Sequence, residues 1–371
     1  MSSFIGNILK NTKSVDKGFY NEAALNKIKN SETVVIWGVG VTAETAFRYY
    51  TNEGVKITCF ADNNKERDNE LYQGLPVNHS DKFFELYKSA CIIIAANKNA
   101  SIDIENQLRS RGYNDIIVYD INLVWSLSDA GTNRKIFEQN AEPIDFVYNL
   151  LADEKSKHVF SNLLKYRLNF DDRLPEEVYD ERAYFDNDVV KSFQGTFLDC
   201  GAFDGDTLQK MLKWDKGSYD KYYAFEPDEK NYTLLEKYCE PLENVYTENM
   251  GIWSKKETLF FTNSGTMTST VNNGGQIQID VDSIDNMFRD DEVNFIKMDI
   301  EGSEIEALMG SKNTISKCKP ILAISNYHKP DHLWEVPIVI NRLNSDYKVL
   351  MRHHSRSWAM DSVCYAVNRV N

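Results

Sequence analysis

Residues 195–207 constrain the fold of this chain most, with the sequence Gly-Thr-Phe-Leu-Asp-Cys-Gly-Ala-Phe-Asp-Gly-Asp-Thr. Apolar residues lead into Asp199, and Gly201 and Gly205 follow before a helical segment begins. Because glycine has no Cβ, the backbone can turn sharply here and pass close to a bulky group. About 20 residues later, a second apolar run ends in Glu226, whose carboxylate could accept both hydroxyls of a ribose. The pattern predicts a nucleoside-binding β-α-β unit.

Two further polar residues follow apolar runs downstream, namely Asn249 and Asp299. In an open α/β sheet, ligands bind at the carboxyl ends of the parallel strands. We therefore expect Asn249 and Asp299 to lie on the same sheet edge as Asp199 and Glu226, around a common site.

A second pattern of this kind occurs near the N-terminus. An apolar run ending at Trp37 precedes Gly38-x-Gly40-x-x-Ala43, and the next strand ends at Asp62, about 20 residues further on. This spacing fits the dinucleotide fingerprint, with Asp62 as the acceptor of ribose hydrogen bonds. Close packing of a helix on a strand demands the same glycine turn. Ligand binding and a purely structural scaffold both remain open for this segment.

The order of the expected elements predicts the domain organisation. Strands alternate with helices, which indicates parallel sheets, and 371 residues exceed the usual size of one domain. We expect an α/β protein with two Rossmann-like domains at residues 1–125 and 193–371, joined by a helical connector at 126–192. Residues 171–177 are expected to form an exposed turn, and the polar loop 262–275 a lid or binding loop.

Composition restricts the kinds of binding partner and the cellular compartment that we expect for this protein. The formal net charge of −14 argues against nucleic acid, which usually requires a basic face. The six cysteines are scattered without a C-x-x-C pair, as expected for reduced thiols. No segment resembles a signal peptide or a membrane span, so we expect a cytoplasmic protein without membrane insertion.

Three further motifs carry a family resemblance. They are Phe-Ile-Lys-Met-Asp-Ile-Glu-Gly-Ser-Glu at 295–304, Tyr-His-Lys-Pro-Asp-His-Leu-Trp at 327–334 and Leu-Met-Arg-His-His at 350–354. Together with residues 195–207 and Glu226, they resemble the FkbM family of S-adenosylmethionine-dependent methyltransferases. The resemblance implies the seven-stranded class I methyltransferase sheet and S-adenosyl-L-methionine as cofactor. It also implies O-methylation of a small-molecule or glycan acceptor, such as a sugar or polysaccharide precursor, which could be nucleotide-linked.

The resemblance also implies roles at the cofactor. Asp199 would anchor the turn, Glu226 would bind the ribose, and Met250 would lie near the adenine or simply belong to the core. Gly201, Phe203 and Asp206 would form the wall around the methionine part. Asn249 would be the other residue near the adenine.

The acceptor side is expected around Asp299, Glu301 and His328. His328 follows a strand in a turn, and it is either a general base or a histidine that fixes a loop. Asp299 and Glu301 would receive the acceptor, bind a divalent ion or cap the next helix, with Lys297 as their partner. No residue is assigned as a metal ligand. His353 and His354 would contact the acceptor or pack structurally.

The N-terminal pattern resembles the nucleotide-sugar-binding domain of bacterial sugar N-acyltransferases. The likeness rests on Gly38-x-Gly40, on Phe-Ala-Asp-Asn-Asn at 60–64 and on Gly-Leu-Pro-Val at 74–77. It implies that Gly38, Gly40 and Asp62 bind substrate. The alternatives are an NAD site, although residues 1–120 have no Tyr-x-x-x-Lys motif, and a binding protein whose methyltransferase domain does not turn over.

Overall fold

The computed structural model describes residues 3–13, 22–96, 98–119, 130–169, 171, 173–185, 188–214, 218–261, 277–356 and 360–368. The chain forms two compact units, an N-terminal unit of Ser14–Thr132 and a C-terminal unit of Met1–Lys13 with Asn133–Asn371. This division differs from the expected one in two ways. Residues 1–13 belong to the C-terminal unit, and most of the expected connector at 126–192 belongs to that unit as well. Among the described helices, none is long and apolar enough to cross a membrane.

The N-terminal unit is built on a six-stranded sheet with the order β3-β4-β2-β1-β5-β6. All its pairings are parallel except the β3–β4 hairpin, which confirms the predicted Rossmann-like arrangement. The strands are β1 (Val34–Trp37), β2 (Cys59–Asp62), β3 (Leu71–Tyr72), β4 (Leu75–His79), β5 (Cys91–Ile94) and β6 (Ile116–Val118). The helical segments are α2 (Glu22–Lys29), α3 (Val41–Asn52), η1 (Lys65–Arg67), α4 (Ser80–Leu86) and α5 (Lys98–Ser110).

Strand β1 lies at the centre of this sheet and is buried on both faces. Val34 and Ile36 join one hydrophobic cluster, whereas Val35 and Trp37 join another on the opposite face. Alternate side chains of a strand point to opposite faces. The continuous apolar run is therefore explained by helices on both sides.

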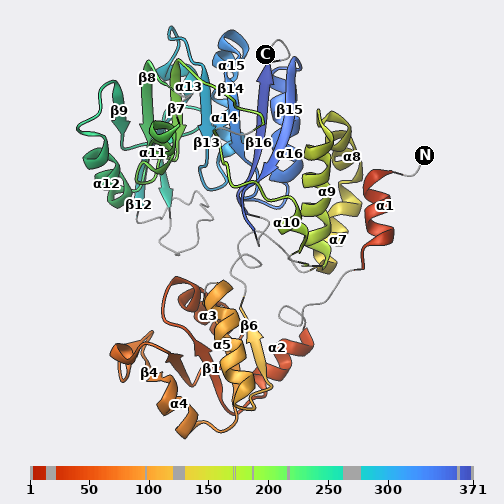
Figure 1. The fold of residues 1–371 in the computed structure, drawn as a ribbon, viewed down its shortest axis with the longest axis vertical. Coiled ribbons are helices and arrows are strands. Elements are labelled where there is room, and N and C mark those ends of the chain that lie inside the picture. Colours follow the sequence, from red (N-terminus) through yellow and green to blue (C-terminus); the bar gives the residue numbers. More distant parts are fainter. Residues whose placement is uncertain are drawn as a thin grey trace. The chain divides into compact units, whose positions relative to one another are not determined.

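The C-terminal unit contains a seven-stranded sheet with the order β15-β16-β14-β13-β7-β8-β9 (Figure 1). Strand β16 runs opposite to the other six strands, which all point the same way. The predicted class I methyltransferase sheet is thus confirmed. The strands are β7 (Thr196–Cys200), β8 (Lys221–Phe225), β9 (Val245–Glu248), β13 (Phe295–Met298), β14 (Ile321–Ser325), β15 (Tyr347–His353) and β16 (Ser362–Asn368). After β7 the chain adds β8 and β9 on one side of β7 in the sheet, and later adds β13 on its other side. This reversal of strand order makes a topological switch point next to β7.

Helices surround this sheet in the same unit. They are α1 (Phe4–Asn11), α7 (Ala130–Gln139), α8 (Ala141–Leu150), α9 (Glu154–Asn169), α10 (Arg173–Glu177), α11 (Asp206–Lys213), α12 (Glu229–Cys239), α13 (Ile284–Met287), α14 (Glu304–Met309), α15 (Lys312–Cys318) and α16 (His332–Leu343). Helix α9 packs on β15, and α8 packs on α16 and α1 (Figure 1). The expected connector is thus part of the layer that covers this sheet.

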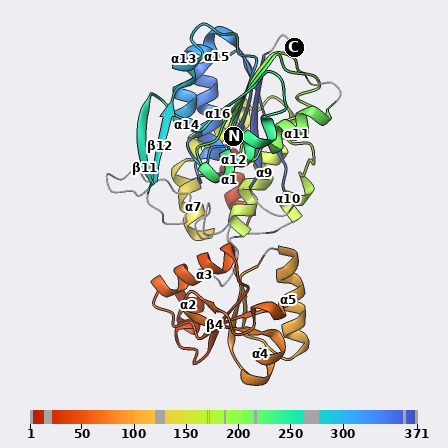
Figure 2. The ribbon, with the colours of Figure 1, turned by 90° about the vertical axis from the view of Figure 1, so that its left-hand side faces the viewer.

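Two local expectations concern the turn at 171–177 and the loop at 262–275. The exposed turn expected at 171–177 is wrong, because most of it forms α10 with Pro175 buried. The strands on either side of the loop at 262–275 are β11 (Glu257–Phe261) and β12 (Ile277–Asp282), which pair antiparallel in a three-stranded sheet with β10 (Gly251–Ile252). Figure 2 shows β11 and β12 side by side in this unit. The loop at 262–275 lies outside the described residues.

Candidate active site

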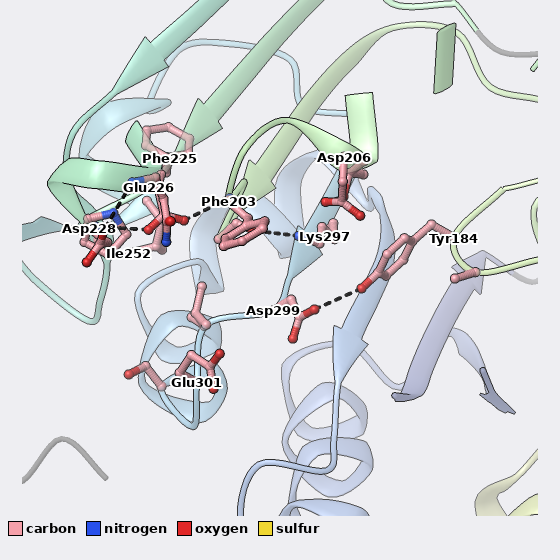
Figure 3. Close-up of a pocket in the computed structure, with 18 of the residues that line it drawn as sticks. Tyr184, Phe203, Asp206, Phe225, Glu226, Asp228, Ile252, Lys297, Asp299 and Glu301 are labelled. Carbon is pink, nitrogen blue, oxygen red and sulfur yellow. Dashed lines mark hydrogen bonds between the residues drawn. The ribbon is translucent and has the colours of Figure 1, made fainter. Parts of the chain in front are cut away.

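A cavity of about 1380 Å³ opens at the carboxyl ends of the central strands of the C-terminal unit. Its wall includes seven residues expected at the site, namely Gly201, Phe203, Asp206, Glu226, Asn249, Asp299 and Glu301. Asp199, Met250 and His328 do not line it, although Asp199 and His328 contact residues that do. In Figure 3, Phe203 lies between Glu226 and Lys297, with Asp299 below Lys297.

The glycine turn after β7 lets two strand ends approach each other. Gly201 has a φ of 80°, and a Cβ on it would lie 2.0 Å from the main-chain oxygen of Asp299. Gly205 also has a left-handed φ and is the N-cap of α11. Phe203 adopts a φ of 50° in the same turn, and its side chain is 53% exposed. Packing against β13 thus requires Gly201, and the turn directs Phe203 to the cavity.

Asp199 lies on β7 just before this turn and is linked to it through Lys297. Its buried carboxylate accepts a hydrogen bond from Tyr222 Oη at 2.6 Å and lies 2.9 Å from Lys297 Nζ. Lys297 Nζ also donates to the Gly201 main-chain oxygen at 2.6 Å.

Lys297 was expected to partner Asp299 and Glu301, but its contacts are with Asp199 and Gly201. The strand register explains this difference, because Lys297 is paired directly with Asp199 across β13 and β7. Paired residues of neighbouring strands share a face. Burial lowers the pKa of Lys297, but the nearby carboxylates of Asp199 and Asp299 outweigh that effect and raise it, so Lys297 is a cation.

Glu226 follows β8 and is held by backbone donors. Its Oε2 accepts the Phe203 N–H at 2.9 Å, and its Oε1 accepts the Asp228 N–H at 3.0 Å. The Asn231 side chain also hydrogen-bonds to this carboxylate, which as an ionised group offers about four acceptor positions in all. Burial raises the pKa of this carboxyl. Asn249 supports the turn, since its Nδ2 donates to the Glu226 main-chain oxygen at 2.9 Å.

Asp299 follows β13 and accepts hydrogen bonds from two tyrosines. Tyr184 Oη lies 3.2 Å from Oδ2 (Figure 3). Tyr327 Oη lies 3.1 Å from Oδ1. Neither tyrosine was predicted as a site residue from the sequence. Tyr327 could have been found because it precedes His328 in the second motif, whereas nothing local marks Tyr184, which comes from the segment before β7.

His328 is enclosed by carboxylates. Its Nδ1 lies 2.8 Å from Glu304 Oε1, while its Nε2 lies 3.5 Å from Asp299 Oδ1 and 3.4 Å from Glu301 Oε2. Burial lowers the pKa of the imidazole, but Glu304, Asp299 and Glu301 together raise it to about 9. The carboxylates around the ring therefore favour the imidazolium form of His328 at neutral pH, which argues against the predicted role of general base.

Glu301 lies at the edge of the cavity with 52% of its side-chain surface exposed. Reduced hydration inside the cavity raises the pKa of this carboxyl to about 7; His328 opposes this shift, whereas Asp299, Glu304 and Glu226 add to it. The residue has a φ of 55°, a left-handed conformation that is costly for a side chain other than glycine. Asp299 and Glu301 are not the caps of α14, whose N-cap is Ser303.

The two adjacent histidines of the third motif differ. His354 lines the cavity, where its Nδ1 lies 2.7 Å from the Asp180 main-chain oxygen and its Nε2 lies 3.1 Å from Tyr365 Oη. His353 is fully buried. Within the described ranges, no group of three or more His, Cys, Asp or Glu side chains is arranged to hold a metal ion.

Packing accounts for the first of the two glycines in the N-terminal pattern and not for the second. Gly38 has a φ of 123°, and a Cβ on it would lie 2.4 Å from the Ala95 main-chain oxygen. Gly40 has open space around it and an extended backbone. Asp62 ends β2, as predicted, and its Oδ1 accepts the Asn64 N–H at 2.8 Å.

Comparison with known proteins gives a family match and a fold match. Residues 199–352 match the family described as the methyltransferase FkbM domain. The crystal structure of methyltransferase FkbM from Methylobacillus flagellatus KT matches with a TM-score of 0.71 and 23% identity, over 95% of each chain. At this identity, the likeness shows the fold. No curated protein matches this chain.

Weaker structural matches have TM-scores too low to support an argument. Fibrillarin from Aeropyrum pernix, with natively bound S-adenosyl-L-methionine, has a TM-score of 0.30 and 11% identity over 46% of this chain and 66% of its own. An rRNA methylase from Streptococcus thermophilus has the same TM-score and identity over 52% and 90%. None of these matches shows the expected likeness of residues 1–125 to sugar N-acyltransferases.

Proposed function

We propose a reaction for this chain from the premise that residues 199–352, which match the methyltransferase FkbM domain, share the activity that this name describes. In this proposal, the cavity binds S-adenosyl-L-methionine and the protein methylates an oxygen of a sugar or glycan precursor. The observation that carries the proposal is the arrangement of Glu226 and Asp299 on one cavity at the switch point of the sheet. That is where open α/β sheets bind nucleosides.

The residues around Glu226 fit the nucleoside part of this cofactor. Glu226 lines the cavity, and its carboxylate would accept hydrogen bonds from the ribose hydroxyls. Asn249, Ile252, Gly201, Phe203 and Asp206 all line the cavity. In this proposal the first two would contact the adenine and the other three the methionine part. When bound, S-adenosyl-L-methionine would supply an electrophilic methyl group.

The groups around Asp299 fit an acceptor rich in hydroxyls. Asp299, Glu301 and Asp361 all line this part of the cavity, and the neighbouring cation Lys297 is already bound by Asp199 and Gly201. Carboxylates accept hydrogen bonds, so a neutral polyol provides the complementary donors. An acceptor with an anionic group beside its reacting oxygen would be repelled.

Glu301 is best placed to take the proton of the acceptor hydroxyl. Its carboxyl is accessible from the cavity, and a pKa of about 7 is close to the value that suits a general base at neutral pH. His328 is less suited to this role, because the imidazolium form that its carboxylate neighbours favour has no lone pair to accept the proton. Asp299, fixed by two tyrosines, would orient the hydroxyl. Binding of a nucleotide-linked part of the acceptor by Gly38, Gly40 and Asp62 stays a prediction.

A methyl-transfer assay tests this proposal. The full chain is incubated with methyl-labelled S-adenosyl-L-methionine and a panel of monosaccharides, nucleotide-sugars and polysaccharide fragments, and label in the sugar fraction is measured. We expect label in at least one sugar class and its loss in Asp299→Asn, with Glu236→Gln on the exposed face of α12 as the control. Transfer only to non-sugar acceptors would contradict the sugar assignment, and no transfer to any acceptor by a protein that binds the cofactor would contradict turnover.

A further inference from the structure

Glu304 is a fully buried carboxylate at the start of α14, behind the cavity wall. Its Oε1 lies 2.8 Å from His328 Nδ1, and its Oε2 lies 3.2 Å from His332 Nδ1. A buried carboxylate is costly unless it is paired and hydrogen-bonded. The two imidazoles provide this environment.

Glu304 also holds the loop that carries the cavity carboxylates. Its Oε1 accepts the Ile300 N–H at 3.0 Å and the Gly302 N–H at 3.3 Å. These two donors flank Glu301, whose φ is 55°. A strained residue persists only where its surroundings fix it. Glu304 therefore fixes the backbone on both sides of the strained Glu301.

The two ring nitrogens of His328 connect Glu304 with the cavity. Nδ1 faces Glu304 at the back, while Nε2 faces Asp299 and Glu301 at 3.5 and 3.4 Å. Tyr327 packs against the ring, with centroids 4.1 Å apart, and His332 of α16 faces the far side of Glu304. Asp361, next to β16, also interacts electrostatically with His328. The surroundings of the ring are thus predominantly acidic, and both N–H groups of an imidazolium face carboxylates.

We propose that Glu304 is a positioning residue, which fixes the backbone around Glu301 and holds His328 as an imidazolium directed at Asp299 and Glu301. Glu304 does not line the cavity, so it would act only through the residues that it contacts. This role goes beyond the cofactor and acceptor residues assigned above. It concerns the protonation of His328, so it can be tested before any acceptor is identified.

The first test is nuclear magnetic resonance of the full chain with ¹⁵N-labelled histidine. The chain has six histidines, and His328→Gln identifies the His328 ring signals by their loss. In the wild type we expect both ring nitrogens of His328 to show imidazolium shifts at pH 7.5. In Glu304→Gln we expect the neutral ring at the same pH and a titration midpoint at least one pH unit lower. Glu306→Gln, an exposed position on the same helix, should match the wild type.

Two results would overturn the proposal. One is a neutral His328 in the wild type at pH 7.5, a measurement that needs no variant to fold. The other is an unchanged His328 titration in a folded Glu304→Gln protein. Calorimetry with S-adenosyl-L-methionine separates this proposal from the proposed function, because failure of the wild type to bind would contradict the cofactor assignment and leave the His328 result unaffected.

Discussion

At the scale of single residues, the cavity carboxylates differ because their neighbours differ. Asp299 accepts two tyrosine hydroxyls, whereas Glu301 is half exposed. Glu304 is fully buried and bonded by backbone and imidazole groups. In the proposed reaction, Asp299 therefore orients the acceptor hydroxyl, Glu301 accepts its proton, and Glu304 supports the loop that carries Glu301. The motif predicts their presence, but only the fold distinguishes these roles.

The role of Glu301 predicts a pH dependence of the reaction. The carboxylate must be ionised to take a proton, so the rate of methyl transfer should rise with pH through about 7. Glu301→Gln should slow transfer by about 10²–10⁴-fold and abolish this rise. The measurement is the initial rate of S-adenosylhomocysteine formation between pH 5.5 and 8.5. Persistence of the same rise in Glu301→Gln would assign it to another group.

The protonation of His328 predicts a pH dependence of stability. Its pKa is raised to about 9 in the folded protein, against an ordinary value of 6.5, so the folded state binds the proton more tightly. The resulting stabilisation is complete below about pH 6.5 and is lost as the pH rises through 9. Urea unfolding of wild type and His328→Gln at pH 6.5 and 9 measures this contribution. The wild type should lose more stability than the variant over this interval, and equal losses would count against the imidazolium.

At the scale of elements, the sequence predicts strand ends well and neighbours across strands poorly. Glu226, Asn249 and Asp299 each directly follow a strand, as expected from apolar runs ending in polar residues. The partner of Lys297 depends on the register of β13 against β7, which no local pattern specifies. Tyr184 reaches Asp299 from a segment 115 positions away. Contacts of this kind need the three-dimensional arrangement.

The two glycines after β1 should differ in their tolerance of alanine. Gly38→Ala places a Cβ against the Ala95 main-chain oxygen at a φ of 123°, whereas Gly40 has open space and an extended φ. We expect Gly38→Ala to destabilise the N-terminal unit by more than about 1–3 kcal/mol, because the close contact adds to the backbone strain. Gly40→Ala should be nearly neutral. Thermal unfolding distinguishes these outcomes, and equal effects would contradict the packing explanation.

At the scale of the whole molecule, the chain enters the C-terminal unit twice. Residues 1–13 belong to it and precede the entire N-terminal unit. Helix α1 is attached through Ile5 N–H, which donates to Asp145 at 2.8 Å, and through Arg134, which donates to the Leu9 and Thr12 main-chain oxygens. The packing partner of α1 lies more than a hundred residues away along the chain, so no local pattern in the sequence predicts this attachment.

This attachment predicts which unit depends on α1. Ile5 is fully buried, so Ile5→Ala should destabilise the C-terminal unit by about 2–4 kcal/mol. Lys10→Ala, at an exposed position of the same helix, is the control. Hydrogen exchange followed by mass spectrometry should show faster exchange in α8 and α1. Faster exchange confined to residues 14–132 would contradict the assignment of α1.

The central claim is that Glu226 holds the ribose of S-adenosyl-L-methionine, and calorimetric titration tests it most directly. Wild type, Glu226→Gln and the control Glu236→Gln are each titrated with S-adenosyl-L-methionine and S-adenosylhomocysteine, after thermal unfolding shows that all three are folded. We predict that wild type and Glu236→Gln bind both compounds alike and that Glu226→Gln binds at least tenfold more weakly. Absence of binding to the wild type would contradict the cofactor assignment, and equal binding by Glu226→Gln would contradict the site.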